Sequence, residues 1–155
     1  MGVGKTAACR ELQRRLDRCV FLDGDWCWDS RPFQVTDETK RMVTENICFL
    51  LNNFLRCTAY RNVVVCCVMH EQPIVDSLLA RLGLGNCALK NISLVCSEQT
   101  LKAHLEKDIA AGVRDPEIIA KSCLRISLYE KLSTVKISVD GKTAAQVAAE
   151  IAALP

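Results

Sequence analysis

The first residues of the chain have the types and spacing that hold a phosphate group. Gly4-Lys5-Thr6 opens a stretch with helical periodicity. Glycines let backbone N–H groups curl round an anion, and the N-terminus of a helix adds partial positive charge. A lysine here reaches β- and γ-phosphates, and a threonine hydroxyl binds Mg²⁺. The alternative is a flexible terminus that happens to contain Gly-Lys-Thr. We predict a phosphate loop formed by Gly2, Val3, Gly4, Lys5, Thr6 and Ala7.

Two carboxylates follow the first apolar run of the chain. Asp23-Gly24-Asp25 comes at the end of residues 19–23, which are predicted to form a buried strand. The carboxyl ends of strands in open α/β sheets face the ligand crevice. Two carboxylates one residue apart can divide the work there: one holds Mg²⁺ through water, and the other accepts the proton of an attacking hydroxyl. The alternative is an Asp-Gly turn whose second aspartate is solvated.

Aromatic and polar side chains near the same strand ends extend the candidate site. Trp26 and Trp28 follow the two aspartates, and we expect them to wall a pocket and stack on a substrate face, with core packing as the alternative. His70 and Glu71 come after the apolar run 62–69 and could contact substrate or a metal-bound water. For His70 a capping or packing role is an equal alternative.

Short apolar runs alternate with helical periodicity along the chain, which indicates βα units and a parallel sheet. We predict one α/β domain over residues 1–155, a doubly wound parallel sheet covered by helices on both faces. His104 lies between charged neighbours on a predicted helix, and we expect it to be solvated. The predicted strands are 19–23, 62–69, 88–96 and 134–139. The predicted helices are 5–17, 37–57, 73–82, one from Ser97 to near Gly112, one capped by Asp115, and one after Thr143.

Composition excludes several classes of protein. The 155 residues carry 20 basic and 18 acidic side chains, a net charge of +2, which lacks the basic excess of a nucleic-acid-binding protein. No apolar run approaches the roughly 18 residues of a membrane helix. The ten cysteines contain no C-x-x-C pair. They therefore favour free thiols in a reducing cytoplasm over a zinc site or disulfides. Oligomeric state is not indicated.

The glycine-rich start and the downstream acidic strand end resemble those of P-loop small-molecule kinases. Shikimate kinase, gluconate kinase and chloramphenicol phosphotransferase are examples. The chain looks most similar to bacterial proteins described as AAA-family ATPases or nucleotide kinases of unassigned substrate, and the resemblance covers essentially the whole chain. Those proteins begin with an apolar strand and a loop such as Gly-Pro-Met-Gly-Val-Gly-Lys-Thr. Met1 matches the methionine inside that loop, so the resemblance implies N-terminal truncation with the first strand missing.

The resemblance also implies roles for individual residues. Thr6 and Asp23 would hold Mg²⁺, while Asp25 would be the catalytic base or substrate anchor beside Lys5. A small lid near residues 112–125 would bring Arg114, and as a second candidate Arg125, onto the ATP phosphates. The implied activity is transfer of the γ-phosphoryl group of ATP to a small-molecule acceptor, for which a sugar, nucleoside or antibiotic is favoured. The alternatives are a nucleotide-binding module without turnover and an ATPase that serves a partner.

Loss of the first strand has a consequence for the sheet. In the resembling family that strand is central and lies between the strands that match 62–69 and 88–96. Without it, each neighbour loses a hydrogen-bonded partner. We expect four parallel strands, with either a gap between the second and third or direct pairing of those two.

Overall fold

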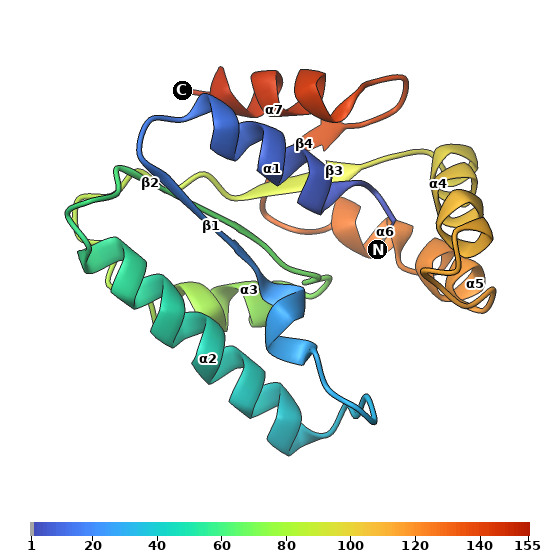
Figure 1. The fold of residues 1–155 in the computed structure, drawn as a ribbon, viewed down its shortest axis with the longest axis horizontal. Coiled ribbons are helices and arrows are strands. Elements are labelled where there is room, and N and C mark those ends of the chain that lie inside the picture. The colour runs from blue at the N-terminus through green and yellow to red at the C-terminus, as the bar shows by residue number, and fades with distance from the viewer. Residues whose placement is uncertain (1) are drawn as a thin grey trace.

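The structure is a computed structural model that describes residues 2–155; Met1, which matched the loop methionine, lies outside the described residues. Helices alternate with strands along the chain (Figure 1). The elements are α1 (Lys5–Arg15), β1 (Cys19–Asp23), the 3₁₀ helix η1 (Gly24–Trp28), α2 (Asp37–Arg56), β2 (Asn62–Cys66), α3 (Gln72–Leu79), β3 (Ile92–Val95), α4 (Glu98–Ala110), α5 (Ile118–Cys123), α6 (Ile126–Glu130), β4 (Val135–Ser138) and α7 (Ala144–Ala152).

The strands form two separate parallel pairs. β1 pairs with β2 in a register that runs from Cys19 opposite Asn62 to Asp23 opposite Cys66. β3 pairs with β4, with Ile92 opposite Val135. Within residues 2–155, no ladder of hydrogen bonds joins β2 to β3. The predicted single sheet is therefore divided in two, and of the two arrangements expected for β2 and β3 the structure has the gap.

Three of the four strands are shorter than predicted, because each ends where its partner ends. β2 stops at Cys66, where β1 passes into η1 and no longer offers a ladder. β3 begins at Ile92 rather than residue 88, because its pairing with β4 begins there. The apolar residues outside the ladders form the loops that border the gap.

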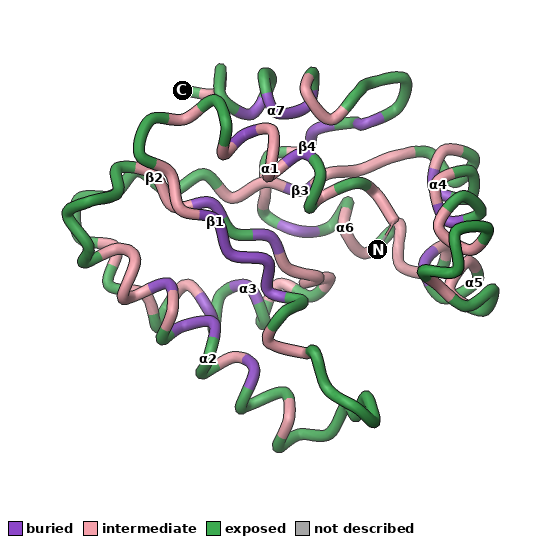
Figure 2. The backbone as a smooth tube through the Cα atoms, in the orientation of Figure 1, coloured by how far each residue is buried: buried purple, intermediate pink, exposed green. Residues whose placement is uncertain are grey.

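Two helices cover one face of both strand pairs. α1 and α7 pack against each other and against the strands, and Figure 2 shows buried backbone along β1, β2 and the inner sides of these helices. The core that they share joins the two strand pairs into one unit. Its buried residues are Ala8, Leu12, Phe21, Val64, Cys66, Ile137, Val139, Val147, Ala148 and Ile151.

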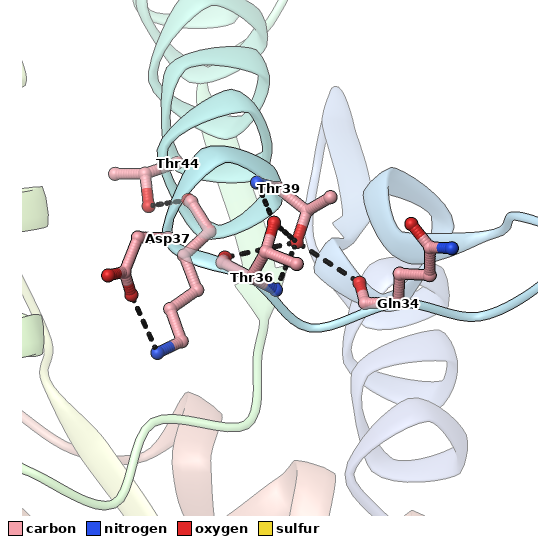
Figure 3. A network of polar contacts seen from close by, with 6 residues as sticks. Gln34, Thr36, Asp37, Thr39 and Thr44 are labelled. Atoms are coloured by element: carbon pink, nitrogen blue, oxygen red, sulfur yellow. Dashed lines mark hydrogen bonds and ion pairs between the residues drawn. The ribbon is translucent and has the colours of Figure 1, made fainter.

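The opposite face of β1 and β2 is covered by α2 and α3. A second core of Val43, Ile47, Leu51 and Leu78 packs there against Leu22. α2 begins at Asp37, where the predicted helix begins, and its N-cap is Thr36, whose hydroxyl accepts a hydrogen bond from the Thr39 N–H at 3.2 Å. The Thr39 hydroxyl in turn accepts the Thr36 N–H at 2.8 Å and donates to the Gln34 carbonyl at 3.0 Å (Figure 3). This capping box fixes where the helix starts.

The segment predicted as a lid, near residues 112–125, contains a turn and the short helix α5, and a second short helix, α6, follows it. α5 begins at Ile118, not at the predicted Asp115-Pro116, and the Asp115 side chain does not cap it. Instead the Asp115 carbonyl accepts the Ile118 N–H at 3.1 Å, so residues 115–118 form a turn before the helix. α4 and α5 lie together at one side of the molecule (Figure 1). In the described part of the chain, no helix is both long and apolar enough to cross a membrane.

Candidate functional site

The phosphate loop ends in a helix N-terminus with open backbone donors. Gly4 adopts the left-handed conformation (φ 85°), which turns the chain into α1 at Lys5. The first intrahelical hydrogen bond at this end runs from the Ala8 N–H to the Gly4 carbonyl at 3.0 Å. No side chain caps the helix, so the N–H groups of its first turn are available to an anion.

The beginning of the same loop packs tightly on α4. A Cβ atom at Gly2 would lie 2.6 Å from Leu105 Cδ2, and its φ of 78° also favours glycine. His104 Nδ1 lies 3.1 Å from the Gly2 carbonyl oxygen. The expectation that His104 is solvated was therefore wrong, because the N-terminal loop crosses the helix face that carries it.

Thr6 and Asp23 meet at the carboxyl end of β1. The Thr6 hydroxyl donates a hydrogen bond of 2.7 Å to Asp23 Oδ2, and Asp23 Oδ1 accepts the Asp25 N–H at 3.1 Å. Asp23 is only 5 % exposed, so its carboxylate is held in one orientation. Asp25, by contrast, is exposed. The two carboxylates thus occupy different environments although one residue separates them.

A pocket of about 340 Å³ opens between the phosphate loop and α4. Lys5, Thr6, Asp25 and Arg114 reach it, as the sequence indicated. Helix α4 adds three residues that the sequence analysis missed, although spacings of three and four residues place them on one helix face. The lining residues are Gly2, Gly4, Lys5, Thr6, Ala7, Asp25, His104, Lys107, Asp108 and Arg114. The pocket has more positive groups and N–H donors (Lys5, Lys107, Arg114 and the loop backbone) than carboxylates (Asp25 and Asp108). This balance suits a polyanion such as a nucleoside triphosphate.

Arg114 is held at the rim of this pocket by Asp108. Its Nε donates a hydrogen bond of 2.9 Å to Asp108 Oδ2, and both side chains are partly exposed. Arg125, the second lid candidate, is the N-cap residue of α6 and does not line the phosphate pocket. The Arg125 guanidinium instead lies near Tyr129. Burial raises the pKa of Tyr129, and the positive charge of Arg125 partly opposes this rise. The structure therefore brings only one of the two candidate arginines to the phosphate loop.

The other predicted site residues lie outside the phosphate pocket. Val3 packs against the core shared by α1 and α7. Trp26 is 61 % exposed, and the Arg10 guanidinium lies 5.6 Å from the centre of its ring. Trp28 packs on the second core, and its ring lies 6.0 Å from that of Phe33. His70 Nε2 is 3.4 Å from Glu71 Oε1, so these two side chains contact each other.

Thiols adjoin the buried side of the site. Cys66 Sγ lies 3.9 Å from the Thr6 hydroxyl oxygen. A hydrogen bond from Cys66 lowers the pKa of Cys9 and raises that of Cys66 itself, and the positive charge of Lys5 adds to the lowering at Cys9. Burial raises the pKa of Cys67 to about 12. All ten cysteines, which fall within the described residues, are free.

The donor set at Thr6 and Asp23 fits the ion that the phosphate-loop motif implies. Mg²⁺ prefers hard oxygen ligands and is usually bound by one or two protein oxygens together with waters and substrate phosphates. The Thr6 hydroxyl and Asp23 Oδ2 offer two such oxygens 2.7 Å apart beside the open N–H groups of α1. Among residues 2–155, no group of three histidine, cysteine or acidic side chains could hold a metal ion by itself.

A family model described as "AAA domain" matches residues 1–120, which include the phosphate loop, both aspartates and Arg114. The chain belongs to this family. A comparison with curated proteins gave no match to this sequence.

Two solved structures share the fold of the chain. The tunicamycin resistance protein of Deinococcus radiodurans superposes with a TM-score of 0.75 at 18 % identity, covering 98 % of this chain and 88 % of its own. A sugar kinase from Janibacter sp. HTCC2649 superposes with a TM-score of 0.67 at 14 % identity, covering 96 % and 86 %. Together with the family match, they identify the fold as that of a P-loop kinase-like NTPase.

Proposed function

We propose that the protein is an ATP-dependent kinase that transfers the γ-phosphoryl group to a hydroxyl of a small molecule. The observation that carries this proposal is the convergence of Lys5, Thr6, Asp25 and Arg114 on one pocket, with Asp23 buried against Thr6. A lysine, an arginine, a hydroxyl beside a carboxylate and a free carboxylate are the groups that phosphoryl transfer uses.

Each of these residues has a definite task in the proposed reaction. The N–H groups of α1 and the Lys5 ammonium bind the phosphates, and Arg114 swings from Asp108 to offset charge on the moving group. Thr6 and Asp23 would hold Mg²⁺, which when bound neutralises the β- and γ-phosphate oxygens. Asp25, exposed on the same pocket, orients the acceptor hydroxyl and takes up its proton.

The acceptor side of the pocket favours a neutral, hydroxyl-bearing molecule. The carboxylate of Asp25 repels a strongly anionic substrate, and the exposed ring of Trp26 lies one residue away and offers a stacking surface. One protein of the same fold is named a sugar kinase, and the other is named for resistance to tunicamycin. These observations support a sugar, a nucleoside or an antibiotic as the acceptor class.

We also propose that the complete sheet has a fifth, central strand, supplied by chain that precedes residue 2. The separation of β2 from β3 supports this, as does the start of the phosphate loop against α4 beside the gap. Such a strand would deliver the first half of the phosphate loop directly to Gly2.

Titration of the chain with ATP in the presence of Mg²⁺ tests the proposed function. The Lys5→Ala variant should lose nucleotide binding and turnover but keep its fold, because Lys5 is a partly exposed residue at the start of α1 and acts as a point charge. Lys40→Ala, which removes an exposed lysine of α2, is the matched control and should behave like the parent.

A panel of sugars, nucleosides and hydroxylated antibiotics then separates the possible activities. A phosphorylated product, detected by mass spectrometry, supports the kinase. Hydrolysis of ATP at the same rate with and without every acceptor would favour an ATPase, and binding without turnover would favour a nucleotide-binding module. Equal turnover in the parent and Lys5→Ala would contradict the assignment of the site.

A further inference from the structure

His104 lies in the phosphate pocket, but the proposed reaction gives it no task. It lines the pocket together with the loop residues Gly2 and Gly4 and with Lys5. The imidazole is partly buried, because the phosphate loop crosses the face of α4 that carries it. A histidine differs from the lysines and the arginine of the pocket, since it gains or loses its charge between pH 5 and 8. The charge of this pocket can therefore change with pH.

One ring nitrogen of His104 is bound to the backbone of the phosphate loop. Nδ1 lies 3.1 Å from the Gly2 carbonyl oxygen. A carbonyl oxygen only accepts hydrogen bonds, so we assign a proton to Nδ1. In the neutral ring Nε2 then carries no proton, and a proton that the ring takes up must bind there. The contact with Gly2 thus decides which nitrogen can titrate.

The loop segment that holds His104 is itself held in place by α4. A Cβ atom at Gly2 would lie 2.6 Å from Leu105 Cδ2 and 3.2 Å from Leu101 Cδ1, so the backbone of Gly2 packs directly on this helix. The carbonyl of Gly2 and the ring of His104 are therefore attached to the same rigid element. The imidazole is oriented before any ligand arrives.

The other ring nitrogen of His104 is available to a ligand. Within residues 2–155, Nε2 has no hydrogen-bond partner, and it is not one of the polar atoms that are both buried and without a partner. The carboxylate one helical turn further on, Asp108, is bound instead to Arg114 at 2.9 Å. A positive charge on the imidazole is therefore not neutralised by an ion pair in the described chain.

The charged side chains around His104 come from several elements. Those that line the same pocket are Lys5 of α1, Asp25 of η1, Lys107 and Asp108 of α4, and Arg114, which follows α4. On α5, which packs against α4, Lys121 is exposed and forms an ion pair of 3.2 Å with Glu117. The three cations of the pocket exceed its two carboxylates by one charge, whereas a bound triphosphate brings several negative charges. Binding of a triphosphate therefore favours the protonated imidazole.

We propose that His104 is a ligand of the nucleotide phosphates that takes up a proton when the nucleotide binds. The new Nε2–H donates a hydrogen bond to a phosphate oxygen, while Nδ1–H keeps its hydrogen bond to the Gly2 carbonyl. The proton comes from solvent and returns to it when the nucleotide leaves. This inference rests on the proposed nucleotide site and adds to it a dependence on pH.

The affinity for ATP should rise as the pH falls. A ligand that prefers the protonated form binds more tightly at low pH, and this advantage is lost as the pH rises through the titration of the complex. If a bound phosphate moves the titration of an ordinary histidine from about 6.5 to about 7.5, the affinity changes about sixfold between pH 6 and pH 8. The terminal phosphate of ATP titrates in the same range, so the parent must be compared with a variant.

Calorimetric titration of the 155-residue chain with ATP and Mg²⁺ at about pH 6 and about pH 8 tests the inference. Between these values the Kd of the parent should rise about sixfold more than that of His104→Gln, whose amide can bind the Gly2 carbonyl but cannot take up a proton. His104→Arg, which keeps its charge, should bind ATP at the higher pH as tightly as the parent does at the lower. His70→Gln removes the other histidine of the chain, outside the phosphate pocket, and is the matched control with the pH profile of the parent. Circular dichroism verifies that each variant folds.

Proton NMR observes the same event in the parent chain. Its two histidines give two sets of imidazole signals, and His70→Gln shows which set belongs to His104. Saturation with ATP should move the titration midpoint of His104 upward by at least about 0.5 pH and leave that of His70 in place. This measurement does not require that a variant at residue 104 folds. Inorganic tripolyphosphate, used as a second ligand, separates a contact with the phosphates from a contact with the base.

The outcomes separate this inference from the proposed kinase. Equal pH dependence of ATP binding in the parent and in His104→Gln would overturn the role of His104 and leave the kinase standing. A midpoint that moves with ATP but not with tripolyphosphate would place the ring at the base and overturn the phosphate contact. Equal loss of binding in His104→Gln and His104→Arg at both pH values would show that the ring only supports the loop. Proton-linked binding without a phosphorylated product would support the inference and contradict the kinase. Absence of ATP binding to the parent would overturn both.

Discussion

At the scale of single residues, Asp23 and Asp25 show how one short segment can supply two different carboxylates. Asp23 is buried, and its two oxygens are engaged by the Thr6 hydroxyl and the Asp25 N–H. Asp25 is exposed and lines the phosphate pocket. The buried group is positioned to hold an ion, and the exposed group is free to meet an acceptor hydroxyl. Their roles follow from environment, because their chemistry is the same.

The Asp25→Asn variant tests this division. It should lower kcat by about 10²–10⁴, the usual contribution of a positioned general base, and change the Kd for ATP by less than about threefold. Asp29→Asn, an exposed aspartate at the end of η1, is the control and should leave both unchanged. Steady-state kinetics and nucleotide titration give the two constants. Equal losses in kcat and in ATP affinity would place Asp25 in the nucleotide site.

Arg114→Ala should lower kcat by about a thousandfold, within the range of arginines that offset charge on a transferred phosphoryl group. Ground-state binding of ATP should change much less, because Arg114 is bound to Asp108 before the site closes. Arg125→Ala serves as the matched control, since Arg125 does not line the phosphate pocket. A loss of kcat in Arg125→Ala with no loss in Arg114→Ala would reverse the two assignments.

The sequence was sufficient to bring part of the site together. Because the carboxyl ends of strands face the ligand crevice, the sequence predicted that Asp23 and Asp25 lie near the phosphate loop. In the structure Asp23 accepts a hydrogen bond from Thr6, and Asp25 lines the pocket beside the loop. His104 could not be placed in this way, because helix periodicity identifies a face but not the loop that crosses it. The contact of His104 with the Gly2 carbonyl depends on tertiary packing between segments about a hundred residues apart.

At the scale of elements, η1 approaches the end of β2 closely, and this contact positions the two aspartates of the site. A Cβ atom at Gly24 would lie 2.2 Å from Cys67 Sγ and 3.2 Å from the Cys66 carbonyl oxygen. A side chain at residue 24 would therefore collide with Cys67 unless Cys67 or η1 shifted. The aspartates on either side of Gly24 take their positions from that contact.

Gly24→Ala should lower the free energy of unfolding by about 1–3 kcal/mol, as overpacking of a tight contact does. Gly83→Ala is the control: a Cβ there would have only one neighbour, Asn52 Oδ1 at an ordinary 3.5 Å, so its effect should be within about 0.5 kcal/mol. Urea denaturation followed by circular dichroism measures both. Similar stability of Gly24→Ala and the parent would show that η1 can move away from Cys67 at little cost.

The sequence predicts where a helix starts when a capping side chain fixes that start. It does not predict where a strand ends when the neighbouring strand fixes that end. Thr36 and Thr143 start α2 and α7 as predicted, because each forms a capping box with a residue three positions on. Asp115-Pro116 has the composition of a helix start, yet its backbone forms a turn and α5 begins at Ile118. The lengths of β2 and β3 depend on the ladders that β1 and β4 offer, which no local pattern in the chain reveals.

At the scale of the whole molecule, the two strand pairs are held together by helices instead of by a continuous sheet. α1 and α7 contribute to a core that touches both pairs. β2 and β3 keep open edges on a cavity of about 830 Å³ between them, lined by residues 62–67 and 91–96, which we call the strand slot. The phosphate loop is attached at the end of this slot, where Gly2 packs on α4. Filling the slot should therefore affect both the stability of the fold and the order of the nucleotide site.

Adding a glutamate, five β-branched residues and a Gly-Pro pair before Met1 should fill the slot covalently and complete the loop. Burial of the new side chains contributes about 1.5–3 kcal/mol each, and ordering the strand offsets most of it. A net gain of about 2 kcal/mol would raise the melting temperature by about 4–8 °C. We expect ATP to bind at least tenfold more tightly to the extended chain, as measured by calorimetry. An extension of equal length with proline at two alternate positions cannot pair with both edges and is the matched control. If this control gives the same gains, or if neither extension raises the melting temperature, the slot does not seat a strand and the open edges of β2 and β3 are a stable feature of the fold.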